Sequence, residues 1–145
     1  MPLIAAAELT MLKEHEVEIR VRYQETDAQG RVHHANYFTY FELGRTELLR
    51  ASGYNYGALE REGWMLVVSD ISCKYYQPAS YDDLLTLRTT VVESRGARVV
   101  TQYQIFRGDM LLAEGVSTVA CVDRQGRVRR LPRELTFDPE EAGGE

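Results

Sequence analysis

Cysteine, proline and tryptophan are scarce in this 145-residue chain, which contains two, four and one of them, respectively. Both cysteines, Cys73 and Cys121, lie in strand-like apolar stretches, so we expect buried, reduced thiols rather than a disulfide framework. No apolar run approaches the roughly 20 residues that a transmembrane helix needs, so we expect no membrane span. The N-terminal MPLIAAAELT lacks a basic start, and acidic residues follow it closely. This pattern is atypical of a signal peptide and indicates a cytoplasmic protein.

Several motifs that define common enzyme classes are also missing. There is no GxGxxG, P-loop, GxSxG or HExxH pattern, which removes the simplest nucleotide-binding, α/β-hydrolase and zinc-protease interpretations. His33 and His34 are adjacent, and no third ligand stands at a recognised spacing from them. We therefore predict no metal site.

Positive charge is in the minority. The net charge of −5 argues against nucleic acid as the main partner. A composition of 44% hydrophobic and 27% charged residues is ordinary for a globular protein, and the length predicts one domain. Residues 124–133 hold five arginines and no acid, whereas residues 134–145 are acidic and contain no base. We therefore expect an N-terminal extension over residues 1–14, one folded domain over residues 15–133 and an acidic, flexible tail over residues 134–145.

Hydrophobic periodicity predicts the first two elements. Residues 16–23 alternate between apolar and charged side chains, which predicts a half-buried strand. A helix is predicted over residues 37–52, with Asn36 as its N-cap and Gly53 as its stop. The apolar arc of this helix is wider than a surface helix needs, and Gly44 in its middle indicates a close approach to a sheet.

The remainder of the chain is typical of strands, after a segment at residues 54–63 that is expected to hold one helical turn. The predicted strands are joined by breaks short enough for antiparallel hairpins and cover residues 64–77, 83–93, 98–107 and 110–122. The predicted fold class is therefore α+β, a five-stranded antiparallel sheet wrapped around one long central helix in the order β-α-β4. One sheet face cannot cover the whole apolar arc of the helix, so we expect a second subunit, joined through edge strands.

Asp27 is the first candidate for chemistry, because it lies in a polar loop at residues 24–36, just before the predicted helix. A helix start presents backbone N–H groups without acceptors and the positive end of the dipole, and both would stabilise an oxyanion formed during acyl transfer. A carboxylate a few residues upstream could attack the carbonyl carbon or activate a water. From the spacing alone, an aspartate that caps its own turn remains the simpler interpretation.

Other polar residues give weaker signals. His33 or His34 could act as an acid–base group or offer a backbone N–H, or could simply be solvated or packed. Glu47 lies at the border of the apolar face of the helix, where a glutamate is usually paired with a basic residue. The available bases are Arg45, Arg50 and Arg88. The arginines of residues 124–133 could bind phosphates of a nucleotide-bearing substrate or belong to a solvated hairpin turn.

One segment resembles a known family. Together with the element order, the string Tyr23-Gln-Glu-Thr-Asp27-Ala-Gln-Gly30-Arg-Val32-His-His34-Ala-Asn36-Tyr37 resembles the hotdog-fold acyl-CoA thioesterases, in the 4-hydroxybenzoyl-CoA thioesterase-like branch that includes the YbgC-type enzymes. The loop of that family has an aspartate, a glycine three residues later and an Asn-Tyr pair at the helix. The positions here are Asp27, Gly30, Asn36 and Tyr37. The last hairpin and exit of the family are similar to residues 111–115, 121–123 and 126–132, and the resemblance covers roughly residues 16–133.

The resemblance implies a thioester hydrolase with Asp27 as nucleophile or general base and the backbone N–H of His34 polarising the carbonyl. Tyr37 would line the acyl pocket, and Gly30, Asn36 and Glu47 are taken as further substrate-binding positions. The candidates for the CoA phosphates are Arg124, Arg127, Arg129 and Arg130. CoA is part of the substrate, so no cofactor is expected. The chain would form a homodimer or homotetramer, with two active sites per dimer at the seam between subunits.

Two other functions are compatible with the same fold. A dehydratase or hydratase acting on acyl thioesters would pair a loop histidine with a helix carboxylate, and His33 and Glu47 have a compatible separation. A non-catalytic protein that binds acyl-CoA or a partner protein would need no such pair. The presence of Asp27 and Gly30 favours the enzyme, so we predict an acyl-CoA thioesterase acting on a small acyl or aroyl thioester.

Overall fold

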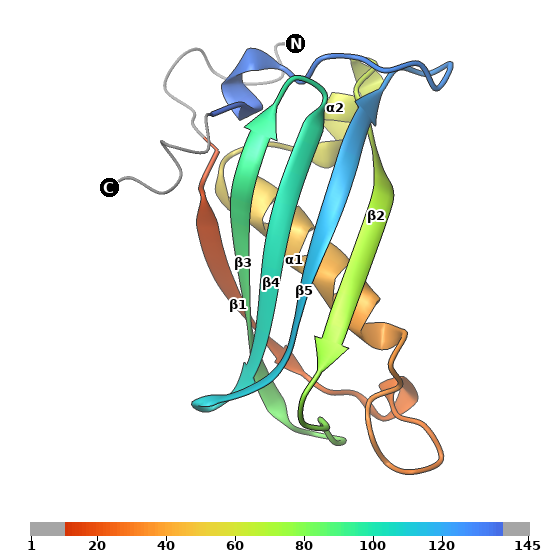
Figure 1. The fold of residues 1–145 in the computed structure, drawn as a ribbon, viewed down its shortest axis with the longest axis vertical. Helices are drawn as coiled ribbons and strands as arrows, with labels where there is room; N and C mark the ends of the chain where they lie inside the picture. Colours follow the sequence, from red (N-terminus) through yellow and green to blue (C-terminus); the bar gives the residue numbers. More distant parts are fainter. Residues whose placement is uncertain (1–10, 138–145) are drawn as a thin grey trace.

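The computed structural model describes residues 11–137, and Figure 1 shows the arrangement of their helices and strands. In chain order, the elements are β1 (Glu14–Arg20), the 3₁₀ turn η2 (Tyr23–Glu25), α1 (Asn36–Ala51), α2 (Tyr56–Arg61), β2 (Met65–Tyr75), β3 (Leu84–Arg95), β4 (Arg98–Arg107), β5 (Met110–Val122) and the 3₁₀ turn η3 (Arg133–Leu135). The described part of the chain contains no helix that is long and apolar enough to cross a membrane.

The strands form one antiparallel sheet in the order β1-β3-β4-β5-β2, with β1 and β2 at its two edges. The long helix α1 runs diagonally across one face of this sheet (Figure 1). This architecture confirms the α+β prediction of a five-stranded sheet around one central helix. Strands β3, β4 and β5 are joined by hairpins as predicted. The predicted hairpin between β2 and β3 is wrong, because β2 pairs with β5 at the edge of the sheet and residues 76–83 cross to β3.

Helix α1 packs closely on the sheet because one of its residues has no side chain. A Cβ added at Gly44 would lie 2.8 Å from Cδ2 of Leu87 and would overlap Oγ1 of Thr89, both on β3. One turn earlier, Phe41 stacks on Tyr103 of β4 with ring centroids 4.4 Å apart. The predicted close approach at Gly44 is therefore confirmed, and it fixes the position of the helix on the sheet.

The start of α1 differs from the prediction. Asn36 is the first helical residue rather than the N-cap, and the N-cap position is occupied by Ala35 without a side-chain hydrogen bond. The side-chain amide of Asn36 instead donates to the backbone carbonyl of Glu25 at 2.8 Å. The loop folds back onto the helix and places the Glu25 carbonyl within reach of the Asn36 side chain, which therefore does not cap the helix. The predicted helix end is confirmed, since Gly53 has a φ of +96°.

The first strand is shorter than predicted. It ends at Arg20, although Val21 still exchanges backbone hydrogen bonds with the segment that precedes β3. Tyr23, predicted on the apolar side of the strand, begins η2 and is 77% exposed. The strand stops because the following residues turn to place Glu25 beneath α1.

The packed part of the chain extends beyond both ends expected for the domain. Met11 and Leu135 are buried in one cluster with Leu48 and Leu59. The expected extension at residues 1–14 therefore includes packed residues, as does the expected tail at residues 134–145. Residues 1–10 and 138–145 lie outside the described residues. Cys73 and Cys121 are both free thiols, half-buried and buried respectively.

Candidate active site

Asp27 lies in a tight turn that is closed by several hydrogen bonds. Its Oδ1 accepts from the backbone N–H groups of Gln29 at 2.9 Å and Arg31 at 3.3 Å. Its own backbone N–H donates to the Arg31 carbonyl, and its carbonyl accepts from Gly30, whose φ is +81°. The turn fixes the carboxylate through one oxygen. The other oxygen, Oδ2, accepts no hydrogen bond within residues 11–137, and the side chain is exposed.

A second loop repeats this turn. Asp123 accepts from the N–H groups of Gln125 and Arg127, each at 2.9 Å, and is followed by Gly126 with a φ of +85°. The sequences of the two turns are Asp-Ala-Gln-Gly-Arg and Asp-Arg-Gln-Gly-Arg. The two turns lie at opposite ends of the molecule, with residues 24–36 at the bottom and residues 123–130 at the top of Figure 1. Turn chemistry explains both aspartates equally, and only the first turn leads into a helix.

The helix start that follows Asp27 offers an unengaged donor. The N–H of Asn36 donates to the His33 carbonyl, and the N–H of Tyr37 donates to the His34 carbonyl. The N–H of Ala35 donates to Nδ1 of His33 at 3.2 Å. The backbone N–H of His34 makes no hydrogen bond within residues 11–137. It stands at the positive end of the dipole of α1, where a developing negative charge is stabilised.

Tyr75 connects this helix start to an edge of the sheet. Its hydroxyl donates to the His34 carbonyl at 2.9 Å, from the last residue of β2. Its ring meets that of Tyr37 edge-on, with centroids 5.0 Å apart. Burial and the neighbouring Cys73 raise the pKa of Tyr75 to about 12, so its hydroxyl remains a donor at neutral pH. Tyr37 is 3% exposed, and burial likewise raises the pKa of its hydroxyl.

Glu25 holds the loop against α1, a role that the sequence reasoning missed. Its carboxylate accepts from the hydroxyl of Tyr40 at 2.8 Å and from the backbone N–H and side chain of Arg22 at 2.9 Å each. Burial alone would raise the pKa of Glu25. The donors from Arg22 and Tyr40 outweigh burial and hold that pKa below its ordinary value. The backbone carbonyl of Glu25 also accepts from the N–H of His33. The residue therefore joins both ends of the loop to the helix.

The remaining loop and helix candidates are engaged locally. Glu47 forms an ion pair with Arg50 on its own helix, in line with the paired interpretation. His33 stacks on His34 with ring centroids 4.3 Å apart. No hydrogen bond or ion pair joins His33 to Glu47 in the described part of the chain. Residues 11–137 also contain no group of three or more metal-ligating side chains placed to hold a metal.

The arginines proposed for CoA phosphates divide into two groups. Arg124 donates to the backbone carbonyls of Glu60 and Arg61, and Arg129 donates to that of Glu62 at 3.1 Å. These contacts satisfy the carbonyls at the end of α2, where positive charge is favourable. Arg129 also lies over the ring of Trp64, 4.0 Å from its centroid.

Within residues 11–137, Arg127 and Arg130 make no comparable side-chain contacts. The backbone of Arg127 closes the turn at Asp123, and the carbonyl of Arg130 accepts from the indole of Trp64 at 2.9 Å. Arg130 lines a surface hollow together with Arg95 and Arg133. Of the four arginines, these two are the ones whose guanidinium groups have no partner among the described residues.

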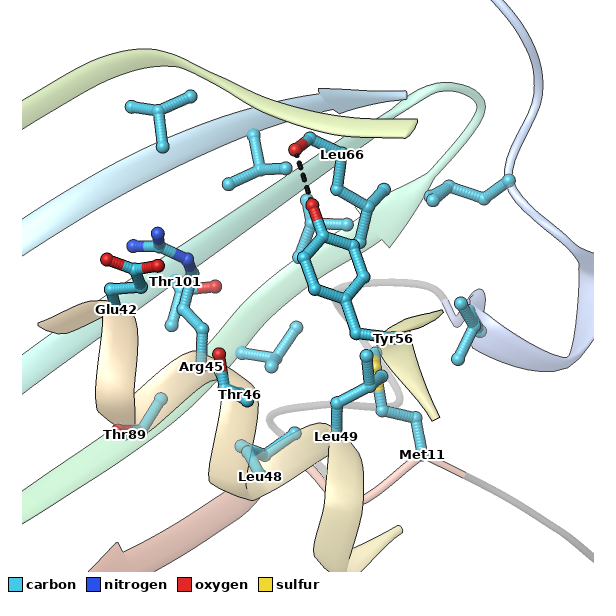
Figure 2. Close-up of a pocket in the computed structure, with 16 residues that line it drawn as sticks. Met11, Glu42, Arg45, Thr46, Leu48, Leu49, Tyr56, Leu66, Thr89 and Thr101 are labelled. Atoms are coloured by element: carbon cyan, nitrogen blue, oxygen red, sulfur yellow. Dashed lines mark hydrogen bonds between the residues drawn. The ribbon is translucent and has the colours of Figure 1, made fainter. Parts of the chain in front are cut away.

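A mostly apolar cavity of about 320 Å³ lies between α1, α2 and the sheet (Figure 2). Its apolar lining includes Leu49 and Tyr56 on the helical side and Leu66 and Val68 on β2. It contains none of the residues at the helix start, so the cavity and Asp27 are separate features within one chain. The sequence did not predict this cavity, because it is formed by side chains from several elements that do not fill the space between them.

The comparisons with known proteins agree on one family. Residues 21–140 match the model of the thioesterase-like superfamily. The acyl-CoA thioester hydrolase YbgC of Escherichia coli (strain CFT073) is 38% identical over 122 residues, covering 83% of this chain and 91% of that protein. A probable thioesterase from Bartonella henselae superposes with a TM-score of 0.78 at 35% identity, covering 82% of this chain and 99% of that one. A DHNA-CoA thioesterase from Staphylococcus aureus gives 0.79 at 30% identity, covering 83% of this chain and 82% of that one.

The fold and these relatives define a hotdog-fold protein. More narrowly, the chain belongs to the thioesterase-like superfamily and is an enzyme of the thioester hydrolase class.

Proposed function

We propose that this protein hydrolyses acyl-CoA thioesters, with Asp27 and the backbone N–H of His34 acting on the thioester carbonyl. The observation that carries the proposal is the unengaged His34 N–H at the start of α1, preceded by a carboxylate whose Oδ2 is unengaged. The relatives named as acyl-CoA thioester hydrolase and DHNA-CoA thioesterase support a CoA thioester as substrate. The acyl part that we propose is the small acyl or aroyl group of the sequence-based prediction.

Thioester hydrolysis requires few catalytic groups. A thioester carbonyl has weak resonance stabilisation and its thiolate leaves readily, so one carboxylate and one donor suffice. Asp27 either attacks the carbonyl carbon, giving an anhydride that water then cleaves, or removes a proton from the attacking water. In both routes the His34 N–H donates to the oxyanion, and loss of one such donor typically lowers the rate about 10²–10³-fold.

We infer that a second copy of the chain completes the site. Strand β2 is an edge strand whose Val67 and Val68 are 44% and 47% exposed. Tyr75 at its end touches the helix start, whereas Leu66 and Val68 near its beginning line the cavity. Antiparallel pairing of two β2 strands would bring the helix start of one subunit beside the cavity of the other. A homodimer is thus the smallest complete unit, and pairs of dimers would give the tetramer.

The experiment compares Asp27→Asn with Asp123→Asn, because the two turns are alike. An asparagine keeps the Oδ1 acceptor in both turns, so neither variant loses its local fold. We expect Asp27→Asn to lower kcat at least about 10²-fold, the low end for a lost acid–base group, and Asp123→Asn to leave kcat unchanged. Free-thiol release from a panel of aliphatic and aromatic acyl-CoAs gives the rates. Equal rates for both variants and the unmodified protein would reduce Asp27 to a turn residue.

A further inference from the structure

The apolar cavity contains one cationic side chain. Arg45 of α1 is half-buried and extends from the helix toward the sheet (Figure 2). Its Nη1 donates to the hydroxyl of Tyr103 at 3.1 Å, and that hydroxyl shares a hydrogen bond with Oγ of Ser117 at 2.7 Å. One of its five N–H donors is thus engaged with a neutral group. No ion pair involving Arg45 occurs within residues 11–137.

Several other arginines of the described chain have carboxylate partners, although the half-buried Arg129 contacts only a backbone carbonyl and the ring of Trp64. Arg50, on the same helix, pairs with Glu47, and Arg107, equally half-buried, pairs with Asp83. Glu42 also lines the cavity, one turn before Arg45, but it is exposed and forms no ion pair within residues 11–137. A charge that lines an apolar space is costly unless it is paired. Arg45 differs from these arginines in lining the apolar cavity, where its charge is available to a ligand.

Two threonines of the sheet also line the cavity. Thr89 lines the cavity from β3 and is 1% exposed. Its Oγ1 is the one fully buried side-chain oxygen or nitrogen in the described residues that has no hydrogen-bond partner. This oxygen is covered by α1 at Gly44, so it offers no contact to a ligand in the cavity. Thr101, its neighbour on β4, lines the same space.

We propose that the cavity binds an acyl group that carries a carboxylate, so that the preferred substrate is a dicarboxylic acid joined to CoA through one of its two carboxyl groups. The apolar walls would receive the methylene chain, and Arg45 would pair with the free carboxylate. At the packing density of protein interiors, a cavity of about 320 Å³ has room for an acyl group of up to roughly ten carbons. This substrate class rests on the proposed thioester hydrolysis and narrows it.

The test uses substrate pairs that differ only in the distal carboxylate. These are suberyl-CoA against octanoyl-CoA, and adipyl-CoA against hexanoyl-CoA. For the unmodified protein, we expect kcat/KM to be roughly tenfold to a hundredfold higher for the dicarboxylic member of at least one pair, as a charge-assisted hydrogen bond allows. We expect Arg45→Met to abolish that preference while keeping turnover of the plain chain. Arg45→Lys should retain part of it, because the charge remains.

Arg50→Met is the matched control, since it removes an arginine from the same helix outside the cavity. It should leave the preference unchanged. A preference for the plain chains in the unmodified protein would overturn the proposal. An Arg45→Met variant that keeps the preference for the dicarboxylic substrate would also overturn it, even if the substitution weakens subunit association.

Binding separates this proposal from the hydrolase proposal. The Kd of each substrate pair is measured by calorimetry in the Asp27→Asn background, where turnover is slowed. The carboxylate site is supported if the dicarboxylic member binds more tightly and this difference disappears in Arg45→Met. This holds even if the unmodified protein hydrolyses none of the four thioesters. Equal Kd values within each pair refute it, even if all four are hydrolysed.

Discussion

The hydrogen bonds of Glu25 should make it one of the most costly residues to remove outside the apolar core. Glu25→Ala removes the acceptor for the Arg22 backbone N–H and for the buried Tyr40 hydroxyl. Hydrogen bonds to a charged group contribute about 1.5–3 kcal/mol each, and the exposed Arg22 side chain adds about 0–1 kcal/mol. We expect the free energy of unfolding to fall by about 3–7 kcal/mol.

A double-mutant cycle isolates the contact between the loop and the helix. Glu25→Ala leaves the Tyr40 hydroxyl buried without a partner, whereas the double variant with Tyr40→Phe removes that hydroxyl as well. The double variant should therefore be less destabilised than the sum of the single variants, by about 1.5–3 kcal/mol. Urea unfolding, followed by the fluorescence of the single tryptophan, Trp64, gives all four free energies. Additive effects within about 0.5 kcal/mol would show that the contact does not hold the loop.

The same contact predicts a pH dependence. The folded state lowers the pKa of Glu25 below its ordinary 4.5, so the folded protein binds this proton less readily than the unfolded chain. The stabilisation is complete above about 4.5 and is lost as the pH falls through the lower, folded-state value. Below that pH, the free energy of unfolding should fall more steeply with acidification in the unmodified protein than in the Glu25→Gln variant. Parallel curves for the two proteins would contradict this assignment.

Two further substitutions test the packing and the arginine segment. Gly44→Ala gains about 1 kcal/mol in helix propensity but forces a Cβ into β3 at an overpacking cost of about 1–3 kcal/mol, so we expect a small net loss of stability in the same urea assay. A more stable variant would mean that the helix can move away from Thr89. Arg129→Met should lower the melting temperature by removing contacts to the end of α2 and to Trp64, while KM for acyl-CoA stays constant. A tenfold rise in KM at unchanged stability would assign Arg129 to the substrate instead.

The fold was largely predictable because its signals are local. The alternating strands, the wide apolar arc of α1 and the positive φ of Gly53 follow from periodicity and from glycine. The role of Asn36 was not predictable, because its partner is a backbone carbonyl eleven residues away in sequence, on a loop whose path the sequence does not specify. A good N-cap residue was used for a tertiary contact.

The candidate site was predictable only in part. Asp27 and Asp123 lie in nearly identical sequences and form the same turn, so a motif alone cannot distinguish them. What separates them is the helix that follows Asp27, and the family resemblance contains that information. The cavity and its Arg45 could not be found in this way, since they depend on how side chains from both helices and four strands converge.

The hydrogen bond from Tyr75 to the His34 carbonyl makes this tyrosine a suitable position for a spectroscopic label that reports on the helix start. It is half exposed at the end of an edge strand, and its hydroxyl contacts His34, the residue whose N–H is the proposed oxyanion contact. A fluorine placed on its ring would sense, through one resonance, both a change at the helix start and a change along the strand. Ligand occupancy and subunit association could then be followed in solution at a single position.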